Sequence, residues 1–169
     1  MNKSELWDRL HYIFDKYDGG ETEIRVTHLK GSEIIEIFRF IWRSGKDVTQ
    51  NGASFWNPQL EQSFPIESVD NADALIVQGT IDTIYMVIAD INFHETVIPD
   101  LGFWFNEDGI DLDFESGPEW GSAEVGALFA FLQSIKNIAP EMQLSLHPLI
   151  IKKVQKEFQR TWQDYLESK

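Results

Sequence analysis

The chain has 169 residues, 43% of them hydrophobic, which is enough to bury a core as a single globular domain (residues 1–169) and excludes an intrinsically disordered protein. It contains no cysteine, which excludes disulfides, zinc–thiolate sites and a thiol nucleophile. The net charge is −14, and residues 47–135 contain sixteen Asp and Glu but no Lys or Arg. We therefore exclude nucleic acid as a partner, because phosphate binding requires clustered Lys and Arg side chains.

The first third of the chain predicts a helix, a strand and a second helix. Apolar residues recur at helical spacing from Ser4 to Tyr17, and Asp18-Gly19-Gly20 ends that run. Residues 22–29 alternate between apolar and polar side chains, which is typical of a strand, and this alternation places His28 on the apolar face. Residues 32–42 are ambiguous: their β-branched content favours a strand, whereas their apolar stripe favours a helix. We predict a helix there.

The middle of the chain predicts a long connection followed by two strands. Residues 47–72 show little periodicity and scattered Gly, Pro, Asn and Ser, so we expect a connection with at most a short strand or helical turn. Residues 74–78 and 81–90 read as strands. The second of these has apolar side chains of both parities, which indicates a central strand buried on both faces.

The strongest local signal is a hairpin over residues 101–115. Asp108-Gly109 is a turn signal between two alternating runs. A two-residue and a four-residue loop both remain possible, but the two registers differ by an even step, so the same side chains share a face in either. The predicted inward residues are Leu101, Phe103, Phe105, Ile110, Leu112 and Phe114. The predicted outward residues are Trp104, Asn106, Asp111, Asp113 and Glu115.

The last third predicts helices over residues 122–136 and 148–166, the second starting at the proline of His147-Pro148. The expected fold is therefore α+β: an antiparallel sheet that includes the 101–115 hairpin, packed by three to four helices.

The search for catalytic residues finds no known motif. The sequence has no glycine-rich phosphate loop, no nucleophile elbow and no metal-ligand spacing among His11, His28, His94 and His147. His94 is followed by Glu95, but neighbours on a strand point to opposite faces. We therefore expect no enzyme activity, no catalytic residue, no metal and no cofactor.

The outward face of the hairpin carries the candidate binding residues. Asp111 and Asp113 share a strand face with β-carbons about 7 Å apart, and Glu115 extends the row. A row of carboxylates can catalyse glycoside hydrolysis, bind a hard cation, contact a protein or only keep the chain soluble. We favour an exposed face or a protein contact over glycoside hydrolysis and cation binding. Trp104 among these acids is either covered by another element, such as the last helix, or the anchor of an interface. Trp56 and Trp120, in loop-like sequence, are candidates for the same surface.

In composition, a small, acidic, tryptophan-containing chain without catalytic motifs resembles the inhibitor and immunity proteins that neutralise bacterial toxins. That resemblance implies a non-enzymatic module that binds a basic protein. The outward face of the hairpin supplies its candidate binding residues, Trp104, Asn106, Asp111, Asp113 and Glu115. The alternatives are a small-molecule or carbohydrate site at Trp104 with Asp111 or Asp113, and a scaffold or oligomerisation module whose charge serves solubility. No apolar run reaches the roughly 18 residues that cross a bilayer, and no signal-peptide pattern is present. We therefore expect a cytoplasmic protein with no membrane partner.

Overall fold

A computed structural model describes residues 1–15 and 20–168. It confirms the α+β class, and its four long helices match the expected number. Within the described residues the α-helices are α1 (Lys3–Phe14), α2 (Gly31–Ser44), α3 (Ala72–Val77), α4 (Ser122–Ile138) and α5 (Lys152–Glu167). The strands of the main sheet are β1 (Glu21–Thr27), β2 (Lys46–Asp47), β3 (Ser54–Asn57), β4 (Gln62–Pro65), β5 (Ile84–Ala89), β8 (Leu101–Phe105), β9 (Ile110–Glu115) and β10 (Gln143–Leu146). A separate small hairpin pairs β6 (Ile91–Phe93) with β7 (Thr96–Ile98).

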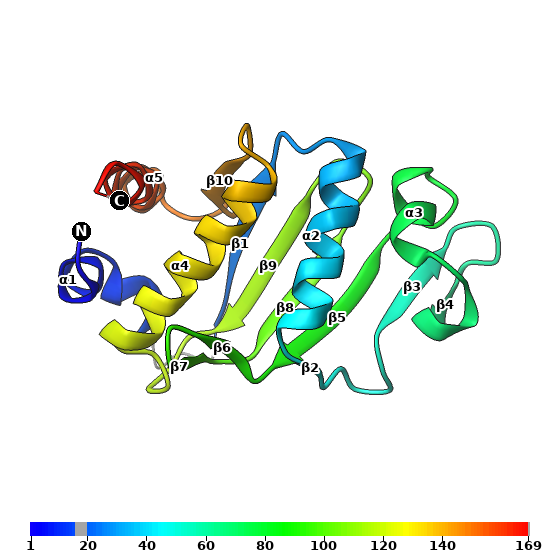
Figure 1. Ribbon diagram of the computed structural model, residues 1–169, viewed down its shortest axis with the longest axis horizontal. Coiled ribbons are helices and arrows are strands. Elements are labelled where there is room, and N and C mark those ends of the chain that lie inside the picture. The colour runs from blue at the N-terminus through cyan, green and yellow to red at the C-terminus, as the bar shows by residue number, and fades with distance from the viewer. Residues whose placement is uncertain (16–19, 169) are drawn as a thin grey trace.

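The main sheet is antiparallel throughout, with the strand order β10-β1-β9-β8-β5-β3-β4 and with β2 paired to β5. The long helices lie on one side of it: α2 crosses in front of β8 and β5, and α4 in front of β9 and β1 (Figure 1). Helix α5 lies beside β10, and α1 packs against both α5 and α4 (Figure 1). This arrangement leaves the opposite side of the sheet without a helix among the described residues.

The hairpin of β8 and β9 forms the middle of the core. Phe105 pairs with Ile110 and Phe103 with Leu112, which is the register of the four-residue loop. All six predicted inward residues of the hairpin are buried, with at most 2% of their surface exposed. Phe105 packs edge-on against Phe38 of α2, with ring centroids 5.1 Å apart. The prediction that the hairpin faces the core with this parity is therefore confirmed.

Two predicted elements are wrong in type or extent. Residues 74–77 belong to helix α3 and not to a strand, and Gln78 is its C-cap. Ala72 and Ile76 bury one helical face, while Asp73 accepts a hydrogen bond from Arg39 of α2 at 2.7 Å. A short apolar run of this kind fits either structure by periodicity alone. The last helix begins at Lys152, and residues 143–146 before it form the edge strand β10, paired with β1.

Smaller corrections concern the edges of elements. The first helix is capped by Asn2, whose side chain accepts from the Glu5 backbone N–H at 3.0 Å, so it starts before Ser4 and ends at Phe14. The predicted stop at Asp18-Gly19-Gly20 lies, apart from Gly20, outside the described residues. Strand β1 ends at Thr27; His28 has a positive φ of 62° and is exposed, so it does not lie on the apolar face.

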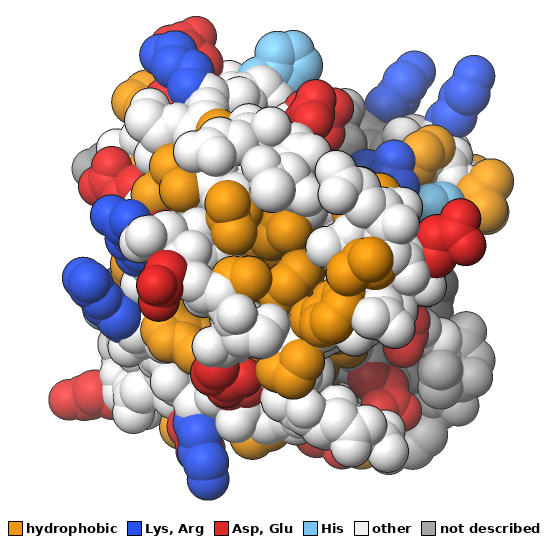
Figure 2. All heavy atoms as spheres, turned by 90° about the vertical axis from the view of Figure 1, so that its right-hand side faces the viewer, with side chains coloured by type: hydrophobic (Ala, Val, Ile, Leu, Met, Phe, Trp, Pro, Cys, Tyr) orange, Lys and Arg blue, Asp and Glu red, His pale blue; other side chains and the backbone are white. Residues whose placement is uncertain are grey.

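The 47–72 segment contains more regular structure than expected, because β3 and β4 form a hairpin that extends the sheet past β5. Strand β5 is central, as predicted, but only its Ile84, Met86 and Ile88 face is fully buried. Figure 2 views the end of the molecule formed by α3, β3 and β4, where hydrophobic side chains gather in the middle and Lys and Arg lie at the margins. Among residues 1–15 and 20–168, no helix combines the length and apolar character needed to cross a membrane.

Candidate binding surface

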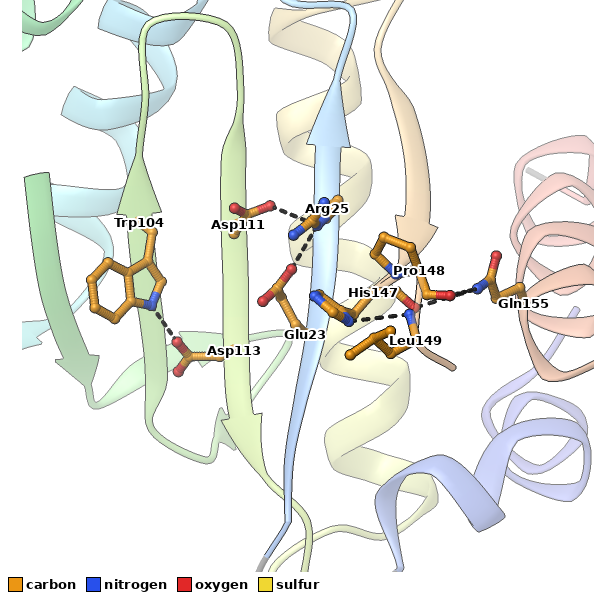
Figure 3. Close-up of polar contacts among 9 residues, drawn as sticks. All are labelled: Glu23, Arg25, Trp104, Asp111, Asp113, His147, Pro148, Leu149 and Gln155. Carbon is orange, nitrogen blue, oxygen red and sulfur yellow. Dashed lines mark hydrogen bonds and ion pairs between the residues drawn. The ribbon is translucent and has the colours of Figure 1, made fainter. Parts of the chain in front are cut away.

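The side of the main sheet opposite α2 and α4 presents every second residue of its strands; we call it the open face. Strand alternation places the following residues there: Glu21, Glu23 and Arg25 of β1, Ser54 and Trp56 of β3, Tyr85 and Val87 of β5, Gly102 and Trp104 of β8, and Asp111, Asp113 and Glu115 of β9. Figure 3 looks onto this face, with the helices behind the strands. These positions include five carboxylates and one guanidinium, and Lys46 of β2, paired with Ala89 of β5, has the same parity.

Trp104 lies in the middle of the open face and is 41% exposed, so neither the last helix nor any other described element covers it. Its ring packs against Tyr85 of the neighbouring strand, with centroids 4.1 Å apart. Its indole N–H donates to the Asp113 carboxylate at 2.6 Å (Figure 3). Gly102, opposite Asp113 in the ladder, makes this contact possible, because a Cβ at that position would collide with the carboxylate. The indole is thus held in one orientation while much of it stays accessible.

Two of the carboxylates near Trp104, those of Glu23 and Asp111, share Arg25 as an ion-pair partner. Arg25 contacts Glu23 at 2.6 Å and Asp111 at 3.4 Å (Figure 3), and the hydrogen bond to Glu23 is the main reason that the pKa of Arg25 is raised. Burial, followed by the charge of Glu23, raises the pKa of Asp111 above its ordinary value, against the opposing effects of Arg25 and His147. Burial also raises the pKa of Asp113, against the hydrogen bond from Trp104. The face therefore holds more negative charge than its own residues compensate.

These raised pKa values predict how stability responds to pH. A carboxyl group whose pKa is higher in the folded than in the unfolded chain destabilises the fold when ionised, and this cost is lost as the pH falls through the folded value. Asp113→Asn removes the charge and keeps an oxygen that accepts from Trp104. We expect this variant to unfold at higher urea than wild type at pH 7, with the difference vanishing below about pH 4, near the unfolded pKa of Asp. A variant less stable than wild type at pH 7 would contradict this account.

A depression of about 500 Å³ lies beside Trp104 on the open face. Its aromatic lining residues are Phe55, Trp56, Tyr85 and Trp104. Phe55 is buried at 3% exposure, and the other three lie on three different strands. Its polar lining residues are Glu23, Ser54, Ser63, Asp82, Thr83, Asn106 and Asp111. The depression thus combines aromatic rings with carboxylates, and no Lys or Arg lines it.

The structure brings most of the predicted binding residues together. Trp104, Asn106 and Asp111 line the depression, and Asp113 holds the Trp104 indole. Asn106, in the hairpin loop, accepts from the Thr83 hydroxyl at 3.0 Å. Glu115 lies apart, in a separate hollow of about 640 Å³. That second hollow is also acidic; its carboxylates are Asp90, Asp100, Glu115, Glu119 and Glu124.

The other tryptophan candidates divide between surface and core. Trp56 is 39% exposed and lines the depression, whereas Trp120 is 3% exposed and packs against both Phe14 and Phe114. Sequence reasoning missed Glu23, Tyr85 and Asp82 as members of the site. The parity of Glu23 and Tyr85 on their strands was visible in the sequence, but the order of the strands, which makes them neighbours of Trp104, was not.

The search for a metal site concerns clusters of ligating side chains. Among residues 1–15 and 20–168, no group of three or more His, Asp and Glu side chains is arranged to hold a metal ion. His94 and Glu95 both have positive φ, in the turn between β6 and β7. Comparisons of the chain with protein-family models, with curated proteins and with solved structures gave no match.

Proposed function

We propose that this chain is a non-enzymatic acidic module whose open face binds a basic protein, in the manner of an inhibitor or immunity-type protein. The observation that carries the proposal is Trp104, which is 41% exposed yet fixed by Tyr85 and Asp113 at the centre of a carboxylate-rich sheet face. Buried aromatic residues surrounded by a polar rim dominate the binding energy of many protein interfaces. In the unbound protein the Trp104 indole is exposed and surrounded by polar side chains, so a partner that covers it would bury it inside such a rim.

The charge distribution supports a basic partner in particular. Residues 47–135, which supply β3, β5, β8 and β9, contain no Lys or Arg. Glu23, Asp111 and Asp113 place three carboxylates within one part of the face, and Arg25 is the basic residue paired with them in the β1–β9 ladder. A surface of one charge sign accelerates encounter with an oppositely charged partner and discriminates against wrong ones. A partner with Lys or Arg at its interface would also relieve the mutual repulsion of these acids.

A pull-down from the native host, followed by binding kinetics at two ionic strengths, tests the proposal. The test variant carries Asp111→Lys with Asp113→Lys. The matched control carries Asp8→Lys with Glu36→Lys, two exposed acids on α1 and α2, so both variants change the net charge equally. We expect the test variant to lower the association rate about tenfold or more at low salt and to flatten its salt dependence. The control should change the rate far less.

Equal effects of the two variants on the association rate would mean that only net charge matters. If both variants bound the partner like wild type, the open face would not be the binding site, and the charge would be explained by a scaffold role or by solubility. Circular dichroism and urea unfolding of each variant establish that it is folded, so that a lost interaction is assigned to the surface and not to the fold.

One observation favours a second candidate function, a small-molecule or carbohydrate site. The depression is concave and is lined by Trp104 and Asp111, and sugars also bind on aromatic faces beside carboxylate and amide groups. Titration with neutral oligosaccharides separates the two candidates. Saturable quenching of tryptophan fluorescence that is insensitive to salt and is lost in Trp104→Ala would favour the carbohydrate site. We favour the protein partner because a neutral sugar gains nothing from the uncompensated charge.

A further inference from the structure

The depression on the open face has the composition of a site for a planar cation. Besides the buried Phe55, three aromatic side chains of the open face line it: Trp56, Tyr85 and Trp104, from β3, β5 and β8, which are consecutive in the sheet. Trp56 and Trp104 are 39% and 41% exposed, so each offers ring surface to a ligand. Three carboxylates, those of Glu23, Asp82 and Asp111, line the same depression. Aromatic faces attract cations through the ring quadrupole, and carboxylates attract them by charge.

The carboxylate best placed for an incoming cation is that of Asp111. Arg25 engages Glu23 at 2.6 Å but Asp111 only at 3.4 Å, so Asp111 is the less firmly held of the two acids. Asp111 also pairs directly with Trp104 across the β8–β9 ladder, so an occupant that lies over the indole is next to this carboxylate. The Asp113 carboxylate, which accepts from the Trp104 N–H, adds electron density to the indole and strengthens its attraction for a cation.

We propose that the depression receives an arginine side chain of the basic partner, with its guanidinium on the aromatic rings and its N–H groups donating to Asp111. This inference rests on the proposed function and names what the open face recognises. Arginine fits better than lysine because a guanidinium is planar, stacks on aromatic rings, is weakly hydrated and donates two parallel hydrogen bonds to one carboxylate. An ammonium group offers only a point charge and gives up more hydration.

Peptide binding tests the inference without knowledge of the natural partner. The probes are fluorescently labelled hexa-arginine, hexa-lysine and hexa-citrulline, the last being a neutral relative of arginine, and the readout is anisotropy at physiological ionic strength. We expect wild type to bind hexa-arginine about 5- to 10-fold more tightly than hexa-lysine and to bind hexa-citrulline weakly. Trp56→Ala should remove most of the preference for arginine. Trp42→Ala, which removes an indole 38% exposed on α2, should leave the preference intact.

A conservative variant guards against a folding artefact: Trp56→Tyr keeps an aromatic face at this position and should retain most of the arginine preference.

The outcomes separate the two proposals. Equal affinity for hexa-arginine and hexa-lysine, with both weakened by Asp111→Lys and Asp113→Lys, overturns the arginine site and leaves the open face as a binder of basic chains. Peptide binding that is indifferent to those two substitutions overturns both proposals. Binding of hexa-citrulline as tight as hexa-arginine, or of neutral oligosaccharides in place of any peptide, overturns the cation site.

Discussion

Phe105→Ala should lower the free energy of unfolding by about 3–5 kcal/mol, the usual cost of lost burial plus the cavity that remains. Phe105 has no exposed surface and lies between Ile84 and Ile110 in the ladders of β5 and β9. Its ring packs edge-on against Phe38 of α2, at 5.1 Å between centroids. Because two strands and a helix hold these neighbours in place, the structure has little freedom to collapse into the space. Urea denaturation followed by circular dichroism measures the loss.

The adjacent residue provides the control. Trp104 lies on the same strand but on the open face, so Trp104→Ala removes a larger side chain that is 41% exposed. We expect a loss of about 1 kcal/mol, from the contact with Tyr85 and the hydrogen bond to Asp113. If Phe105→Ala cost less than about 1 kcal/mol, or no more than Trp104→Ala, the assignment of the two faces of this hairpin would be wrong.

The facing of the hairpin was predictable because it depends on parity alone. Asp108-Gly109 located the turn, and either loop length kept Phe103 and Phe105 on one side and Trp104 on the other. The structure adopts the four-residue loop, closed by the Asn106 N–H donating to the Gly109 carbonyl at 2.9 Å. Because both possible registers place the same side chains on the same face, the turn signal and the alternation were enough to predict which hairpin residues are buried.

The region before the last helix was not predictable in the same way. His147-Pro148 resembles a helix start, but the His147 N–H donates to the Glu23 carbonyl at 3.0 Å and so continues the pairing of β10 with β1. The Gln155 side-chain amide then donates to the carbonyls of His147 and Pro148, both at 3.3 Å (Figure 3). It also donates to the Ile150 carbonyl at 2.8 Å, and these bonds hold the turn before α5 begins. These contacts join residues that are distant in the sequence or several positions apart. The sequence of a four-residue edge strand does not predict them.

The candidate site shows the same division between local and tertiary information. The outward direction of Trp104, Asp111 and Asp113 followed from alternation, but their exposure depended on all the long helices packing on the other side of the sheet (Figure 1). The proximity of Trp56 and Tyr85 to Trp104 depended on the strand order, in which β5 separates β8 from β3. Periodicity assigns a side chain to a face; it does not determine which strands become neighbours.

Trp104→Ala should raise the dissociation rate of the partner complex by about 30-fold or more, which corresponds to about 2 kcal/mol. The expectation follows from the geometry of the indole in the unbound protein. Tyr85 and Asp113 already fix its orientation, so little side-chain freedom is lost on binding, and its exposed surface is available for burial. The association rate should change much less, because it responds mainly to charge and Trp104 carries none. Surface plasmon resonance with the captured partner measures both rates.

Two further variants show whether the effect of Trp104→Ala comes from the lost ring, from the lost hydrogen bond to Asp113, or from removing any exposed tryptophan. Trp104→Phe keeps an aromatic face but removes the N–H that Asp113 accepts, so it should raise the dissociation rate less than Trp104→Ala does. Trp42→Ala removes a comparably exposed indole from α2, on the helix-covered side, and should leave both rates unchanged. Because the two tryptophans differ in exposure by only a few per cent, a difference between their variants reports position and not hydrophobicity. Equal effects of Trp42→Ala and Trp104→Ala would place the interface elsewhere and leave the open face without its anchor.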